Sequence, residues 1–176
     1  MSEEEKQPEE QINEEEEKEE EEKEEPELDS QGNPISPEDL AKGPRHPLKF
    51  EVLKTCLKKL SKTFDGLSYA FTALDIHEKE LDDLGQDINK FTQLRNINAS
   101  NNKLKEMSPL INMPYLSIVD FSINALKDMS IFSNTEAFQY LQVLNLKQNK
   151  IKTLPEMHAR YLKELNLSEN KIVSCA

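Results

Sequence analysis

One spacing of hydrophobic and polar positions recurs four times in the second half of the chain. Each copy spans eleven residues, opens on leucine, has apolar residues at its fourth, sixth and eleventh positions, and carries an asparagine at its ninth. The copies read LRNINASNNKL (94–104), LSIVDFSINAL (116–126), LQVLNLKQNKI (141–151) and LKELNLSENKI (162–172). Their asparagines, Asn102, Asn124, Asn149 and Asn170, are 22, 25 and 21 residues apart. A period of this length is typical of a repeat protein whose units stack.

Alternation inside the frame predicts one short β-strand in each unit. In Leu144-Asn145-Leu146 the two leucines point to one side of the strand and the asparagine points to the other. The asparagine of the ninth position follows the strand, where its amide can bond backbone groups that the turn would leave unpaired. The sequence therefore predicts an α/β fold, a leucine-rich repeat solenoid. Its parallel strands would form the concave face, and helices or irregular coils the convex face.

The pattern divides the chain into three parts. Residues 1–35 are predicted to be a disordered acidic tail, residues 36–66 a helical N-terminal cap, and residues 67–176 the repeats. A degenerate first repeat, FTALDIHEKEL (71–81), precedes the four clear ones and has Lys79 in place of the asparagine. The segment 133–140 inserts about three residues, which we expect on the convex side.

Two helices are predicted in the cap. Ser36, followed by Pro37 and two acidic residues, has the composition of a helix start. A second, amphipathic helix is predicted from Leu48 to about Phe64, because four apolar residues share one face: Leu53, Leu57, Leu60 and Phe64. We expect this helix to cover the first coil, since terminal repeats need a cover. The alternative is a basic helix that binds a partner or a membrane surface.

The C-terminal end shows no comparable cover. Ile172 and Val173 would leave Leu162, Leu165 and Leu167 open along one side. Either further repeats follow or a partner covers this end, and we favour further repeats, so the repeats are expected to be incomplete.

Charge is distributed unevenly. The first 30 residues carry 17 acidic side chains and 3 lysines, a net of −14, whereas the remaining residues carry a net of +2. The run can be a solubilising tail or an arm that docks on a basic partner. The near-neutral remainder argues against nucleic acid as a partner. No leader and no run of 18 apolar residues is visible, so we expect an intracellular protein that does not interact with membranes.

Residues for catalysis or metal binding are not grouped in the sequence. Cys56 and Cys175 are the only cysteines, and His46, His77 and His158 lack metal-ligand spacing. The four glycines are spread singly, so no phosphate-binding loop is predicted. We expect a non-enzyme with no cofactor.

Function is therefore predicted on the concave sheet, where outward side chains of successive strands form columns about 4.8 Å apart. Ile118 and Val143 are adjacent aliphatic residues suited to an interface, although two small side chains mean little alone. The predicted protein interface consists of Asn96, Asn98, Ile118, Asp120, Val143, Asn145, Lys147, Glu164 and Asn166.

The segment before and within the first repeats resembles a known family. An amphipathic stretch leads into GLSYAFTALDIHEKELDDL (66–84), and the turn NNKLKEMSPL (101–110) follows, after an acidic N terminus. In these features the chain resembles the leucine-rich repeat-containing protein 23 family, over roughly residues 50–126 and more weakly beyond. The resemblance implies a structural protein of the ciliary axoneme, a radial spoke component within a large hetero-complex of axonemal proteins.

Two other classes of repeat protein stay open. A leucine-rich repeat regulatory subunit of a serine/threonine phosphatase grips its enzyme through the concave face, but usually with aromatic and acidic residues there. A spliceosomal or nuclear repeat protein typically has its acidic run after the repeats. The acidic run of this chain comes first, which disfavours the nuclear class.

Overall fold

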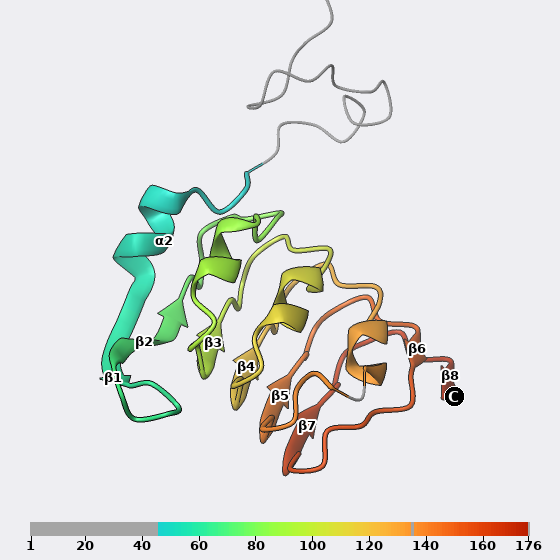
Figure 1. The fold of residues 1–176 in the computed structure, drawn as a ribbon. Helices are drawn as coiled ribbons and strands as arrows, with labels where there is room; N and C mark the ends of the chain where they lie inside the picture. The colour runs from blue at the N-terminus through green and yellow to red at the C-terminus, as the bar shows by residue number, and fades with distance from the viewer. Residues whose placement is uncertain (1–45, 135, 176) are drawn as a thin grey trace, which may run out of the picture. The chain divides into compact units, whose positions relative to one another are not determined.

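The computed structural model describes residues 46–134 and 136–175. The predicted acidic tail and the predicted helix at Ser36 lie outside the described residues. Figure 1 shows the remaining chain as coils stacked one behind the next, each with its strand in the same place. The main sheet has six strands in the order β1-β2-β3-β4-β5-β7. Their bounds are Leu57–Lys62, Tyr69–Asp75, Asn96–Asn98, Ile118–Asp120, Val143–Asn145 and Glu164–Asn166.

Strands β2 to β7 of this sheet are parallel and in the predicted register. Ile97 lies beside Val119, Val119 beside Leu144, and Leu144 beside Leu165. The first three of these side chains are at most 1% exposed, whereas Leu165 on the last strand is 39% exposed. The chain is a leucine-rich repeat solenoid, as the eleven-residue frame predicts, and each coil buries the apolar side chains of its neighbour.

The returning part of each coil contains a single turn of 3₁₀-helix or a short extended segment. The 3₁₀-helices are η1 (Asp87–Lys90), η2 (Ser108–Asn112) and η3 (Ser130–Ser133). Two short strands, β6 (Thr153–Leu154) and β8 (Ser174–Cys175), pair parallel in the last coils. The insertion after η3 is anchored by Phe138, whose buried ring lies 4.7 Å from that of Phe132. The extra residues thus add to the core of the returning segment.

The repeat asparagines form a ladder of hydrogen bonds beneath the turns. Asn149 is 6% exposed, and its Nδ2 donates to the carbonyl oxygens of Phe121 (2.9 Å) and Leu146 (3.1 Å). Its Oδ1 accepts from the backbone nitrogen of Leu126 in the preceding coil (3.1 Å). Asn102, Asn124 and Asn170 repeat this arrangement. Each amide therefore joins two coils through backbone groups that would otherwise be unpaired in a dry interior.

The residue before each ladder asparagine adopts a left-handed conformation. Asn101, Ile123, Gln148 and Glu169 have φ of 54–58°. A β-branched residue such as Ile123 rarely adopts this conformation, so the turn is imposed by the hydrogen bonds around it. The ladder asparagine thus fixes the path of the chain out of the strand.

The N-terminal cap differs from the prediction of one helix from Leu48 to about Phe64. Helix α2 spans only Phe50–Cys56, and the chain then continues as β1, antiparallel to β2. Of the four residues predicted on the apolar face, Leu53 is buried and Leu57 is half-buried, but Leu60 and Phe64 are 61% and 53% exposed. The cap is therefore a short helix followed by a β-hairpin, and the predicted helix is wrong beyond Cys56.

The hairpin forms because the first strand of a parallel sheet has an open edge. Strand β2 is seven residues long, more than twice the length of β3, and its outer backbone groups pair with β1. An unpaired edge of this length would bind other strands. In the degenerate repeat, Leu74 and Ile76 are buried, as the apolar positions of the frame predict. Phe71 occupies the first apolar position of that repeat, but it lies opposite Leu60 on β1 and is 41% exposed.

A polar cluster joins the two strands of the hairpin at the base of the first repeat. Lys58 Nζ lies 2.5 Å from Asp75 Oδ2, and His77 Nδ1 lies 2.6 Å from Asp75 Oδ1. Hydrogen bonding by Lys58, and then by His77, lowers the pKa of Asp75 from 3.8 to about 2. The charged form of this carboxylate is favoured by folding.

Replacing a ladder asparagine should destabilise the solenoid more than replacing its neighbour. We expect Asn149→Ala to lower the free energy of unfolding by about 2–4 kcal/mol, because buried backbone groups of two coils lose their partners. Urea denaturation followed by circular dichroism measures this. The control is Lys150→Ala, an exposed neighbour that should change the free energy by less than about 0.5 kcal/mol. Equal losses in the two variants would refute the role of the ladder.

The Asp75 cluster should make stability depend on pH in the acid range. Since the pKa of Asp75 is lowered by folding, its contribution is present above the unfolded value of about 3.9. That contribution is lost as the pH falls through about 2. Asp75→Asn should therefore weaken the pH dependence of the free energy of unfolding between about pH 4 and 2. In an NMR titration, Lys58→Met should raise the pKa of Asp75. An Asp75 carboxyl that titrates near 4 in the unmodified chain would contradict this.

Candidate protein-interaction surfaces

The nine residues predicted as an interface lie on one face of the sheet, which we call the open face. The register places Asn96, Ile118, Val143 and Glu164 in one column and Asn98, Asp120, Asn145 and Asn166 in the next. Lys147 follows two residues after Asn145 and points the same way. The structure therefore brings the predicted residues together, and their role as an interface stays a prediction.

The first column is mainly apolar at its centre. Ile118 is 42% exposed, and Val143 lies directly beside it on β5. Asn96 and Glu164 bound the pair on either side. Two neighbouring aliphatic side chains between polar ones suit a small apolar contact with a partner rather than a deep binding pocket.

The second column is polar and held in place by local hydrogen bonds. Asn98 Oδ1 accepts from the backbone nitrogen and the hydroxyl of Ser100, and Asp120 Oδ1 accepts likewise from Ser122. Asn145 Nδ2 also donates to Asp120 Oδ2 at 3.0 Å, which links two coils. These acceptors are largely used within the chain, so the column forms a flat surface with fixed side chains.

Lys147 lies at the boundary of the open face and is paired. Its Nζ is 3.0 Å from Glu169 Oε1 in the next coil. Hydrogen bonding by Lys147, and then by Gln148, lowers the pKa of Glu169. Both partners are exposed, so the pair fixes the position of the lysine more than it stabilises the fold.

A second surface, which the sequence reasoning missed, lies along the edge where the strands begin. Its members are aromatic, and we call it the aromatic edge: Phe64, Tyr115, Tyr140 and Tyr161. The Phe64 ring lies 4.5 Å from that of Tyr115 and 5.2 Å from that of Tyr140. Phe64 lies in the turn of the hairpin, and its backbone nitrogen donates to Gln93 Oε1 at 3.1 Å. The hairpin thus extends over the first repeats and completes the edge.

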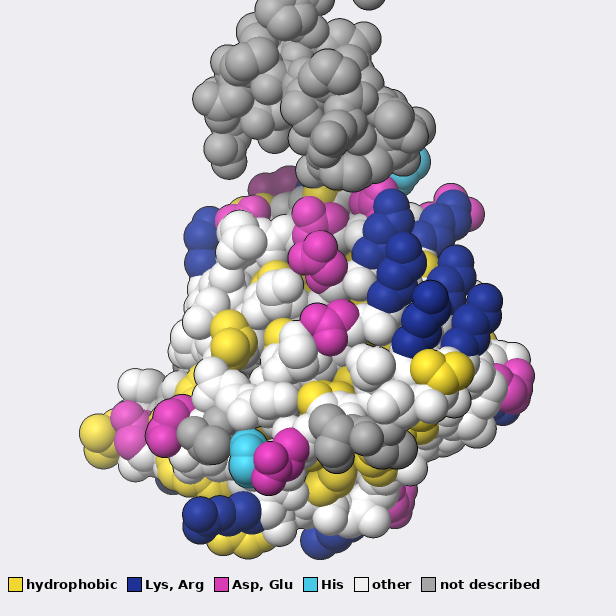
Figure 2. Space-filling model, turned by 90° about the vertical axis from the view of Figure 1, so that its right-hand side faces the viewer, with side chains coloured by type: hydrophobic (Ala, Val, Ile, Leu, Met, Phe, Trp, Pro, Cys, Tyr) yellow, Lys and Arg dark blue, Asp and Glu magenta, His cyan; other side chains and the backbone are white. Residues whose placement is uncertain are grey.

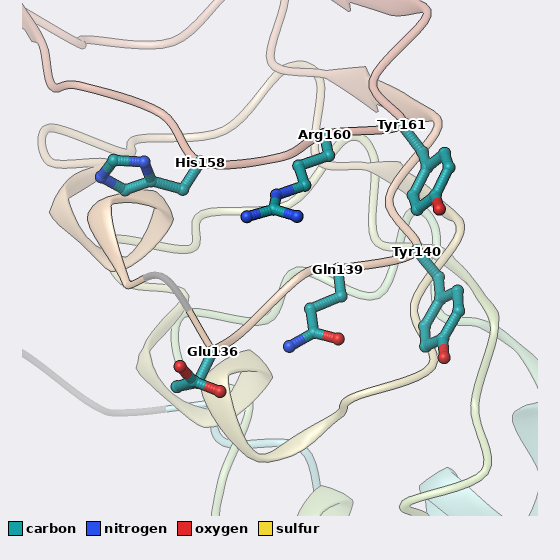
Figure 3. Close-up of a pocket in the computed structure, with 6 residues that line it drawn as sticks. All are labelled: Glu136, Gln139, Tyr140, His158, Arg160 and Tyr161. Carbon is teal, nitrogen blue, oxygen red and sulfur yellow. The ribbon is translucent and has the colours of Figure 1, made fainter.

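Tyr161 continues the aromatic edge beyond the stacked rings. Tyr140 and Tyr161 line the same open pocket of about 330 Å³, and Figure 3 shows their rings one above the other on the same side. The Arg160 side chain projects toward the segment that carries Tyr140, whereas the Gln139 side chain points to the far side of that segment (Figure 3). With Phe64 53% and Tyr161 61% exposed, this edge offers amphipathic aromatic side chains of the kind enriched at protein interfaces.

A signal for the aromatic edge is present in the sequence. The residue before the first leucine of each frame is Gln93, Tyr115, Tyr140 or Tyr161. Three tyrosines at one frame position predict a column of rings, but the eleven-residue frame begins one position later. Phe64 could not be added in this way, because its place depends on the hairpin that replaced the predicted helix.

Groups suited to metal binding are not assembled in residues 46–134 and 136–175. No three His, Cys, Asp or Glu side chains there come together to hold a metal ion. His77 is hydrogen-bonded to Asp75, whereas His158 lines the open pocket near the aromatic edge. Within the same residues, no helix has both the length and the apolar character needed to span a bilayer.

Comparison with known proteins agrees with the resemblance found in the sequence. The chain is 29% identical over 126 residues to leucine-rich repeat-containing protein 23 of Homo sapiens and, to the same extent, of Bos taurus. The match covers 60% of this chain and 35% of each relative, so the chain spans about a third of their length. No protein-family model matches.

A solved structure with a similar arrangement is an internalin of Listeria monocytogenes. It is 16% identical in sequence, with a TM-score of 0.43 over 60% of this chain and 47% of that chain. The repeat frame, the parallel register and the asparagine ladder of the chain itself establish the fold. A leucine-rich repeat solenoid with exposed columns of side chains is a scaffold for protein interactions, and the chain is similar to leucine-rich repeat-containing protein 23.

Proposed function

We propose that this protein is a non-catalytic structural subunit of the ciliary axoneme. In this role it is a radial spoke component that binds other spoke proteins through its leucine-rich repeats. The observation that carries the proposal is the similarity to leucine-rich repeat-containing protein 23. The repeat frame alone is shared by many proteins, but the resemblance also includes the segment before the clear repeats, which is specific to the family.

The exposed surfaces support binding to proteins rather than to small molecules. The open face is flat and mostly polar with one aliphatic pair, and the aromatic edge is exposed at Phe64, Tyr140 and Tyr161 and half-buried at Tyr115. Large interfaces with proteins need such extended surfaces, whereas small ligands need enclosed pockets. In a subunit of a large assembly, each surface would contact a different neighbour.

Retention in isolated axonemes tests the proposal. A tagged full-length chain expressed in ciliated cells should remain with detergent-extracted axonemes and be released with the spoke proteins by high salt. Two double variants, Ile118→Ser with Val143→Ser on the open face and Tyr140→Ser with Tyr161→Ser on the aromatic edge, should each reduce retention at least fivefold. Truncating exposed apolar anchors removes contact area with a partner.

The matched control is Ile111→Ser with Val173→Ser, which removes exposed aliphatic side chains away from both surfaces. This control should be retained as well as the unmodified chain. Absence of the unmodified chain from axonemes would overturn the proposal. Co-purification of serine/threonine phosphatase activity with the chain would favour a regulatory subunit instead.

A further inference from the structure

Six exposed lysines project from four successive coils just beyond the asparagine ladder. They occupy the two frame positions that flank the apolar residue after each asparagine, which is buried at Leu104, Leu126 and Ile151. We call them the lysine stripe: Lys103, Lys105, Lys127, Lys150, Lys152 and Lys171. Because the residue between each flanking pair points into the core, the lysines point outward together.

Backbone hydrogen bonds hold the coils that carry the stripe side by side. Ala125 donates to the carbonyl of Leu104 (2.9 Å), and Lys150 donates to that of Leu126 (2.8 Å). Lys171 then donates to the carbonyl of Ile151 at 3.0 Å. This register aligns Lys105 with Lys127 and Lys152, and Lys150 with Lys171. The backbones that carry the stripe are therefore held about 4.8 Å apart, and lysines of neighbouring coils lie side by side.

The charges of the stripe are almost unpaired within the described part of the chain. Of its six ammonium groups, only that of Lys103 lies near a carboxylate there, 3.6 Å from Glu80. Figure 2, which looks at the C-terminal end of the coils, shows Lys and Arg side chains gathered at one corner of the molecule. The near-neutral charge of residues 31–176 hides this arrangement, because acids elsewhere balance it. Clustered like charges of this kind raise the local potential for an oppositely charged partner.

We propose that the lysine stripe binds a short acidic segment of a partner protein. The segment would lie across the coils, with its carboxylates opposite the aligned lysines. Lys105 and Lys127 also line a surface depression of about 520 Å³, but Asp82, Asp83 and Glu106 line it too, so the acidic segment would lie beside this depression and not in it. This inference does not depend on the ciliary proposal, because it rests on the register and charge of the stripe.

One observation favours a short acidic segment of a protein over the continuous phosphate backbone of a nucleic acid. The stripe ends at the first repeat against acidic residues, Asp82 and Asp83, which also line the depression. A continuous phosphate backbone would be repelled there, whereas a short acidic segment can stop before it.

A binding and crosslinking experiment tests the inference. Fluorescein-labelled decaglutamate is titrated into the full chain at 50 mM and 300 mM salt, and bound peptide is coupled with a carbodiimide and mapped by mass spectrometry. We expect crosslinks at Lys127, Lys150 and Lys152. Binding should weaken at least tenfold at the higher salt, because exposed charges are screened.

Charge-reversed variants separate the stripe from net charge. Lys127→Glu with Lys152→Glu should weaken peptide binding at least tenfold, whereas Lys62→Glu with Lys163→Glu, exposed lysines outside the stripe, should weaken it less than twofold. Circular dichroism melts verify that both double variants fold. Equal weakening in both, no binding by the unmodified chain, or crosslinks only to glutamates of its own first 30 residues would overturn the proposal. So would tighter binding of a 20-nucleotide single-stranded or duplex DNA than of the peptide.

Discussion

The structure depends on the pairing of backbone groups beneath the turns by the repeat asparagines. Each coil leaves its strand through a left-handed residue, and the peptide groups around this turn face an interior without water. Asn149 satisfies groups of its own coil and of the coil before it with one amide. The same contact therefore shapes the turn and joins neighbouring repeats, so that burial of leucines and satisfaction of polar groups occur together.

The sequence predicted the fold of the repeats correctly, but it did not predict the hairpin that covers the first repeat. Ile97, Val119, Leu144 and Leu165 lie in the predicted rungs because an eleven-residue frame specifies both strand and turn. Leu57 and Leu60 have helical spacing, yet they lie in a strand. They form a strand because they pair with the open edge of β2, and this tertiary contact outweighs their local helical propensity.

The candidate surfaces show the same division. The columns of the open face follow from alternation along the strands, so Ile118 and Val143 could be placed side by side from sequence. The tyrosines of the aromatic edge lie at the position before the frame, so the frame itself does not include them. The place of Phe64 beside Tyr115 depends on the hairpin turn, which the sequence did not predict. The lysine stripe also follows from the frame, because its lysines recur at the same two positions. The net charge of the repeats does not reveal it, since net charge says nothing about where the charged residues lie.

The frame separates the three surfaces by position, so one solenoid presents three chemically different surfaces. Residues before the strand give the aromatic edge, residues within it give the open face, and residues after the asparagine give the lysine stripe. Tyr140, Val143 and Lys150 of a single coil represent the three surfaces in turn. Because the coils stack in register, each kind of side chain recurs along the solenoid axis, and the three surfaces stay separate. A change at one frame position can therefore alter one interaction while the asparagine ladder, and with it the fold, is preserved.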